Sequence, residues 1–152
     1  MVFKGKGLED KPSPSAEIRE ISESEIDVGN KLLFTIFGLS TEWKKKWDRL
    51  TLDWMRKGIG KYYVAYVEGK PVGTSFLFSL MKTGGIFNVG TIEEYRKRGI
   101  GTALTVHAIK GSIREGNDLH TLETTKEGNA ERLYKKIGFV TDHTATWYTK
   151  NL

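Results

Sequence analysis

Apolar residues recur at helical spacing in the first third of the chain. Ser22-Glu23-Ser24-Glu25 has the pattern of a capping box, in which a hydroxyl accepts a bond from a main-chain amide and a Glu reaches back. The helix that this box would start is expected to end at Gly38. A second helix is expected from about Ser40 to Lys57. Its apolar face comprises Trp43, Trp47, Leu50 and Trp54. The tryptophans are most simply assigned to the core, and the alternative is that an exposed one lines a cleft.

Strand patterns follow after Gly60. Tyr62–Val67 is rich in β-branched and aromatic residues, and residues 68–71 are typical of a turn. Val72–Met81 is expected to return as a hairpin strand, and Ile86–Thr91 to be the third strand of the meander. Further elements are expected as strands at Ala16–Ile21, Leu119–Thr124, Phe139–Val140 and Thr146–Tyr148, and as helices at Ile100–Arg114 and Asn129–Ile137. Hairpin strands first and a β-α-β crossover late are typical of an α/β domain.

Size and composition fit one globular domain. The 152 residues suffice for a single core, and 38% hydrophobic with 11% aromatic residues exclude a long disordered chain. Residues 1–15 are rich in Lys, Gly, Pro and Ser, so we expect a flexible N-terminal segment there and a domain over residues 16–152. No apolar run approaches the ~20 residues of a membrane span. We therefore expect a cytoplasmic protein with no membrane partner.

Charge and residue types exclude several kinds of site. A net charge of +5 permits an anionic partner without identifying one. Zero cysteines exclude disulfides, thiolate metal ligands and a cysteine-acyl intermediate. His107, His120 and His143 lack the spacing of metal ligands, so no metal is expected. Nucleic-acid binding would need basic residues interleaved with exposed aromatic residues on a platform, an arrangement that the late strands lack.

The segment Arg96–Thr102 lies between a predicted strand and a predicted helix. Its glycines allow the backbone to approach a ligand closely, because no Cβ stands in the way. The first amides of the helix and the positive end of its dipole favour an anion, and three adjacent cations add to the local potential. This combination suits a diphosphate. The alternative is an ordinary surface loop between strand and helix.

Two other phosphate-binding patterns do not fit. A P-loop requires Gly-x-x-x-x-Gly-Lys followed by Ser or Thr, which no stretch provides. A dinucleotide fold requires Gly-x-Gly-x-x-Gly in its first β-α unit. Here Gly99 and Gly101 are followed at the third place by Leu104, and the loop comes after a hairpin.

Two motifs together resemble those of the GNAT superfamily of acetyl-CoA-dependent N-acetyltransferases. Arg96-Lys97-Arg98-Gly99-Ile100-Gly101 matches the family pattern of Gln or Arg, two residues, Gly, one residue, then Gly or Ala. Phe87–Thr91 looks like the strand before it, and Tyr95 takes the usual aromatic place. Ala130–Phe139 is similar to the family's late helix, with Leu-Tyr followed four places on by Gly-Phe. The motifs also occur in the family's order.

The resemblance implies a fold and a co-substrate. The fold is a single-domain α/β GNAT-like fold, with a mixed central sheet of about seven strands, splayed between the fourth and fifth and flanked by about four helices. Acetyl-CoA would lie where Ile86–Thr91 and Leu119–Thr124 splay apart, its pantetheine arm bonded to the main chain of Val89 and Thr91. The implied residues of this acetyl-CoA site are Val89, Gly90, Thr91, Arg96, Lys97, Arg98, Gly99, Ile100, Gly101, Thr102, Asn129 and Tyr134.

The reaction that the resemblance implies is direct attack of a primary amine on the thioester while both substrates are bound. Tyr134 corresponds to the tyrosine that serves many members as general acid at the leaving sulfur; the alternative is a packed aromatic residue. For the general base we favour Glu123, against an exposed carboxylate at a strand end. Asn129 is expected either to contact the coenzyme or to cap its helix.

Acceptor and assembly stay open at this level. The acceptor would be an amine of a protein or peptide, or a small-molecule amine. An alternative from another class is a catalytically silent domain that binds acyl-CoA as a sensor or interaction module. A homodimer is possible through pairing of the late strands, as in some relatives.

Overall fold

The protein is built around one seven-stranded sheet with the order β2-β3-β4-β5-β6-β1-β7. The computed structural model describes residues 1–5, 8 and 16–148. The strands are β1 (Val2–Phe3), β2 (Glu17–Glu20), β3 (Gly60–Val67), β4 (Lys70–Leu80), β5 (Thr83–Thr91), β6 (Leu119–Leu122) and β7 (Phe139–Val140). The helices are α1 (Ile26–Phe37), α2 (Lys44–Arg56), α3 (Ile100–Arg114) and α4 (Asn129–Ile137), with 3-10 turns η1 (Glu23–Glu25), η2 (Thr41–Trp43) and η3 (Glu93–Tyr95).

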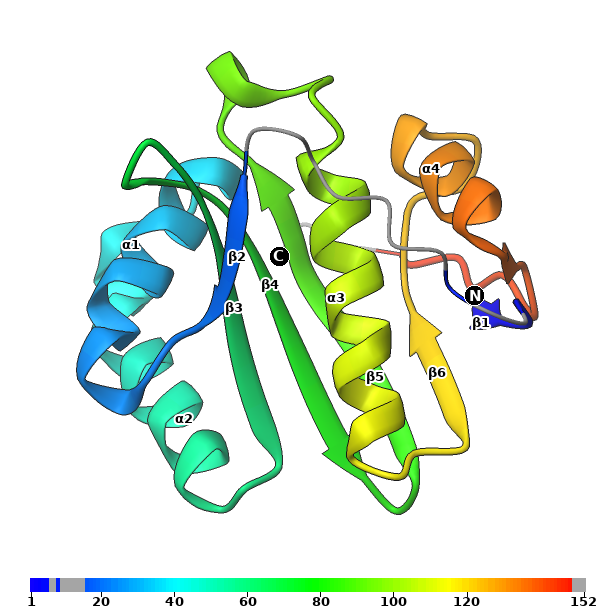
Figure 1. Cartoon of the computed structure of the whole chain (residues 1–152), viewed down its shortest axis with the longest axis horizontal. Helices are drawn as coiled ribbons and strands as arrows, with labels where there is room; N and C mark the ends of the chain where they lie inside the picture. Colours follow the sequence, from blue (N-terminus) through cyan, green and yellow to red (C-terminus); the bar gives the residue numbers. More distant parts are fainter. Residues whose placement is uncertain (6–7, 9–15, 149–152) are drawn as a thin grey trace.

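Strand pairing follows the order of the chain as far as β5. Strands β2 to β5 form an antiparallel meander, and β6 joins β5 in parallel after the crossover through α3. Helices α1 and α2 lie on one side of the sheet and α3 on the other, while α4 lies near the start of α3 (Figure 1). The predicted α/β fold with a mixed seven-stranded sheet and four helices is confirmed.

The sheet has a hydrophobic core on each face. Neighbouring residues of β3 face opposite sides, as the pleat of a strand requires. Tyr62 lies in the cluster with Leu32 on the side of α1 and α2. Tyr63 lies in the cluster with Leu77 and Leu104 on the side of α3. Because β3 and β4 are covered on both faces, they form the rigid centre against which the rest of the fold is positioned.

The predicted ends of the first helix agree with the structure, whereas α2 begins at Lys44, after a 3-10 turn, and not at about Ser40. The capping box at Ser22 and Glu25 forms and starts η1, which leads into α1. Gly38 ends α1 with a φ of 61°. The core assignment of the tryptophans holds for Trp54, which packs against Phe78 with ring centroids 5.4 Å apart. It is wrong for Trp43, which is 58% exposed because it precedes α2 in η2. Within the described ranges, no helix has the length and apolar character that crossing a membrane requires.

The strand between β6 and β7 differs from the prediction. Val2 pairs with Thr121 of β6 and with Val140 of β7, so β1 lies between these two strands. The prediction of a flexible segment over residues 1–15 is therefore wrong at β1. Residues 6–7 and 9–15 lie outside the described residues. The strand expected at Thr146–Tyr148 is wrong, since these residues are not in a strand and their aromatic side chains are exposed. Strand β1 instead provides the seventh strand of the sheet, between β6 and β7.

Candidate active site

The sheet is split between β5 and β6. Parallel pairing starts with Thr83 opposite Leu119 and stops at Ile86 opposite Leu122. Strand β5 then continues to Thr91, whereas β6 ends earlier than the sequence predicts. In Figure 1 the two strands diverge toward the end of the sheet at which α3 begins. The predicted splay is confirmed, and among the described strands none pairs with the open side of this end of β5.

Main-chain groups at the end of β5 point into this opening. The N–H of Ile92 donates to the carbonyl of Val72 in β4, with an N–O distance of 2.9 Å. Successive residues of a strand present their main-chain groups to opposite sides. Gly90 therefore faces β4 as Ile92 does, and Val89 and Thr91 face the open side. These are the two residues that the family resemblance assigns to the pantetheine arm.

The start of α3 offers main-chain donors at the same end of the sheet. Gly99 is the N-cap of α3 and has a φ of 79°, a left-handed conformation that glycine adopts without steric cost. Ala103 donates to the carbonyl of Gly99 at 3.0 Å. Within the described residues, no hydrogen-bond acceptor is present for the main-chain N–H groups of residues 99–102. Unpaired N–H groups at the positive end of a helix dipole attract an anion, which is the physical basis of the predicted diphosphate site.

Two cations of this segment bond to the main chain that precedes it. Arg96 donates from Nε to the carbonyl of Thr91 at 3.1 Å, and Arg98 from Nη2 to the carbonyl of Glu94 at 3.1 Å. The guanidinium of Arg98 also lies over the ring of Tyr95, 4.9 Å from its centroid. Sequence reasoning treats these arginines as sources of positive potential only. The structure shows that they also fix the shape of the turn between β5 and α3.

Helix α4 forms the other side of the opening. A Cβ built on Gly101 would lie 3.7 Å from Cδ1 of Leu133, so α4 approaches the first turn of α3 closely. Tyr134, the next residue, is buried, with its ring centroid 6.0 Å from that of Phe139. Burial raises the pKa of the Tyr134 phenol. The phenol therefore stays protonated at neutral pH, as a general acid must.

The segment between β6 and α4 is held by a residue that sequence reasoning missed. The carboxylate of Glu131 accepts from the N–H of Glu127 at 2.6 Å and from the hydroxyl of Thr141 at 3.2 Å. Lys135, one turn on, lies 2.9 Å from the same carboxylate and is the main cause of its lowered pKa. A Glu in the first turn of a helix, four residues before a Lys, is the signal that points to this role.

The remaining predicted site residues lie around this segment. Glu123 directly follows β6 and is exposed. Asn129 is also exposed and is the first residue of α4, whose N-cap is Gly128. The helix-cap role expected for Asn129 is therefore wrong, and contact with the coenzyme stays a prediction.

Two of the three histidines pack against other side chains. His120 is buried, its Nδ1 2.8 Å from the hydroxyl of Ser112, and burial lowers its pKa. The ring of His107 packs against Tyr63 with centroids 4.8 Å apart.

The end of α1 borders β5 on the face opposite α3. A Cβ built on Gly90 would lie 2.5 Å from Cγ2 of Ile36 and 3.1 Å from the ring of Phe37, so only glycine fits there without a shift. The ring of Phe37 is half exposed. The residues at the end of α1 therefore lie beside the open part of β5, on the side from which α3 is absent.

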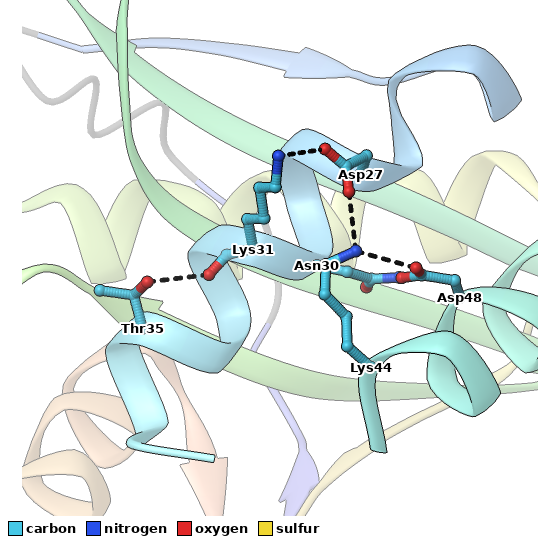
Figure 2. A network of polar contacts seen from close by, with 6 residues as sticks. All are labelled: Asp27, Asn30, Lys31, Thr35, Lys44 and Asp48. Carbon is cyan, nitrogen blue, oxygen red and sulfur yellow. Dashed lines mark hydrogen bonds and ion pairs between the residues drawn. The ribbon is translucent and has the colours of Figure 1, made fainter. Parts of the chain in front are cut away.

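A polar network holds α1 against α2 (Figure 2). The ammonium of Lys44 lies 2.7 Å from Oδ1 of Asp27 and 2.8 Å from Oδ2 of Asp48. The side-chain amide of Asn30, fully buried, donates to the other oxygen of Asp48 at 2.8 Å. Because Asn30 and Asp27 belong to α1 and the others to α2, the network fixes the position of α1 and of its end beside β5.

A sheet split beside an open strand, with an anion-receptive helix start at the same end, is the arrangement that the family resemblance implies for acetyl-CoA. The chain belongs to the GNAT acetyltransferase family, whose model matches residues 30–139. The recognition of the family from its two motifs is thus confirmed. The acetyltransferase activity of that family, and its use of acetyl-CoA, are proposed for this chain below.

Two curated relatives carry the name of N-acetyltransferases. The chain is 30% identical over 134 residues to an uncharacterized N-acetyltransferase of Methanocaldococcus jannaschii, a match that covers 80% of this chain and 59% of the relative. It is 29% identical over 92 residues to an N-alpha-acetyltransferase of Sulfurisphaera tokodaii, covering 51% of this chain and 55% of the relative. The chain therefore spans less than two thirds of the length of either relative.

Solved structures share the fold at low sequence identity. AAC(6')-Iy in complex with a coenzyme A bisubstrate analogue superposes with a TM-score of 0.74 at 13% identity, covering 90% of this chain and 99% of that chain. The PaiA N-acetyltransferase of Thermoplasma acidophilum in complex with coenzyme A gives a TM-score of 0.69 at 18% identity, covering 86% and 93%. At these identities the likeness concerns the fold.

Proposed function

We propose that this chain transfers the acetyl group of acetyl-CoA to a primary amine, which belongs to a protein or peptide or to a small molecule. The observation that carries the proposal is the position of two sets of main-chain donors at one end of the sheet. The open side of Val89 and Thr91 suits the pantetheine arm, and the unpaired N–H groups of residues 99–102 suit the diphosphate. One linear molecule can reach both sets only if it lies along the split.

In the proposed reaction the amine nitrogen attacks the carbonyl carbon of the thioester. The N–C bond forms, the C–S bond breaks, and the carbonyl oxygen is stabilised by the outward N–H of Val89. Tyr134 donates its proton to the leaving sulfur. Glu123 accepts a proton from the attacking amine, directly or through water, since its exposed carboxylate stands where β6 ends beside the split.

The other implied contacts complete the acetyl-CoA site. Gly90 lies between Val89 and Thr91, and its missing side chain lets Ile36 and Phe37 of α1 pack against this part of β5. The exposed side chains of Arg96, Lys97 and Arg98 add positive potential around the diphosphate. Asn129, at the start of α4, is proposed to contact the coenzyme from the opposite wall. The name of the Sulfurisphaera relative favours a protein α-amine among the acceptors.

Turnover tests the proposal. The purified chain is mixed with acetyl-CoA and with peptides and small amines in turn, and the free thiol of coenzyme A is followed. Thiol release that depends on the acceptor supports transfer. Binding of coenzyme A in calorimetry without acceptor-dependent thiol from any amine would instead establish the silent acyl-CoA-binding module. The absence of any coenzyme A binding would refute both.

A further inference from the structure

Strand β5 carries one extra residue beside the opening. Phe76 of β4 pairs with Phe87, but Thr74 pairs with Gly90, so a single residue of β4 is opposite both Asn88 and Val89. This is a β-bulge. Asn88 has a φ of 55°, in the left-handed region that Asn tolerates better than most residues.

The bulge decides which way Val89 faces. Phe87 and Gly90 are each paired with a β4 residue whose main chain faces β5, so both face β4. In a regular strand every second residue faces the same side, and Val89 would then face β4 together with Phe87. The extra residue shifts this alternation by one. The N–H of Val89 points into the split only because the bulge is present.

Thr74 supplies the bond that holds the bulge. Its hydroxyl donates to the carbonyl of Asn88 at 2.7 Å, and the side chain is fully buried. The hydroxyl is also close enough to the Tyr62 phenol to lower its pKa against the larger effect of burial. A bulge withdraws a carbonyl from the strand ladder, and a buried carbonyl without a donor is costly. Thr74 satisfies that carbonyl in the bulged register only.

We propose that Thr74 is a positioning residue for acetyl transfer: its hydroxyl stabilises the bulge at Asn88 and so aims the N–H of Val89 at the thioester oxygen. This inference rests on the proposed function. Thr74 lies on the face of the sheet that carries α1 and has no contact with the open side itself. Its effect on the reaction is transmitted through the main chain of β5.

The test compares Thr74→Val, which keeps the shape and removes the hydroxyl, with Thr74→Ser, which keeps the hydroxyl. We expect Thr74→Val to lower kcat about 10- to 100-fold, because the oxyanion donor is displaced, which costs up to about 100-fold, and is not removed, which costs about 100- to 1000-fold. Its Kd for coenzyme A should stay within about threefold, because the diphosphate donors lie in α3. Thr74→Ser should restore kcat to within about threefold of the wild type, whereas a merely structural threonine would not separate kcat from affinity in this way.

Ser75→Ala is the matched control. Ser75 is the next residue of β4, equally buried, and its hydroxyl lies 3.5 Å from the carbonyl of Leu104 in α3 on the opposite face. Ser75 is the β4 residue opposite the bulge, but Ser75→Ala removes a buried hydroxyl while leaving the bond from Thr74 to Asn88 in place, so kcat should change less than about threefold. A folded Thr74→Val protein with wild-type kcat would overturn the proposal, as would an equal loss in Ser75→Ala.

A second variant and a second readout keep the test independent of folding and of turnover. If Thr74→Val does not fold, Asn88→Val tests the same bulge, because a β-branched residue is strained at positive φ, and it should lower kcat by a similar factor. Amide hydrogen exchange measures the bulge without any reaction. In the wild type the N–H of Val89 should exchange faster than that of Gly90, and this difference should disappear in Thr74→Val. If the N–H of Val89 is protected from exchange in the wild type, the inference about Thr74 fails. If the N–H of Val89 exchanges as expected but no amine is acetylated, only the proposed function fails.

Discussion

A carboxylate introduced at Gly99 would test the proposed diphosphate site directly, and the chain contains a matched control. Gly99 precedes α3 with a φ of 79°, and Gly116 follows the same helix with a φ of 76°. At both positions, apart from chain neighbours, nothing lies within 4 Å of where a Cβ would be built. Gly99→Glu and Gly116→Glu therefore impose the same backbone strain and the same charge, at opposite ends of one helix.

The two variants should lose similar stability but differ in affinity for coenzyme A. A residue with a side chain in the left-handed conformation costs about 1–2 kcal/mol, which corresponds to a fall in Tm of about 2–8 °C for a chain of this length. At Gly99 the new carboxylate would also lie about 5 Å from a bound phosphate. With an effective dielectric constant of about 20, the repulsion is about 3 kcal/mol. Since about 1.4 kcal/mol is a factor of ten, Kd for coenzyme A should rise about 100-fold.

Calorimetric titration with coenzyme A measures this difference, and thermal unfolding checks that both variants are folded. Gly116→Glu should bind coenzyme A within about threefold of the wild type. If Gly99→Glu binds as tightly as Gly116→Glu, the diphosphate does not lie at the start of α3, and the reasoning from the unpaired N–H groups is refuted.

Three further predictions concern buried polar groups. Tyr134→Phe should lower kcat by about 100-fold or more at an unchanged Kd for acetyl-CoA, measured by thiol release and calorimetry; unchanged kcat would remove Tyr134 as the general acid. Burial raises the pKa of Tyr62, Tyr63 and Tyr134, so their neutral forms stabilise the fold below about pH 10. The free energy of unfolding from urea titrations should therefore fall as pH rises above about 10, and a flat profile there would contradict this. Asp48→Ala leaves the buried amide of Asn30 without its acceptor and should lower the free energy of unfolding by about 1–3 kcal/mol; a change below about 0.5 kcal/mol would show that the network in Figure 2 contributes little.

Local signals in the sequence predict the elements that local physics determines. The capping box at Ser22 and the glycine at position 38 bound α1 because caps and left-handed residues act within one turn of helix. The motif around Gly99 places the start of α3 for the same reason. In each case the residues that determine the structure are neighbours in the chain, so the sequence alone suffices to predict where the helix begins or ends.

Pairings between distant segments were not predictable in this way. Strand β1 is two residues long, too short for any periodic pattern, and its place depends on β6 and β7 more than a hundred residues away. The aromatic residues of Thr146–Tyr148 have high strand propensity, but propensity does not say which segment takes a shared edge. The bulge at Asn88 is a difference between two registers of β4 and β5. The sequence of β5 alone does not determine its register with β4, so the orientation of Val89 and the proposed role of Thr74 could be inferred only from the fold.

The structure also explains why an arginine and a glycine both belong to the motif before α3. Arg96 donates to the carbonyl of Thr91, the last residue of β5, and thereby ties the strand end to the turn that leads into α3. This bond occupies one of the two open-side groups of Thr91, so the N–H of Thr91 and both groups of Val89 remain for a ligand. Because Arg98 is likewise bonded within the turn, recognition of a diphosphate rests first on main-chain N–H groups whose positions these arginines fix. In the proposed site, the bond from Arg96 to Thr91 therefore fixes the distance between two elements. One is the strand that would hold the pantetheine arm, and the other is the helix start that would hold the diphosphate.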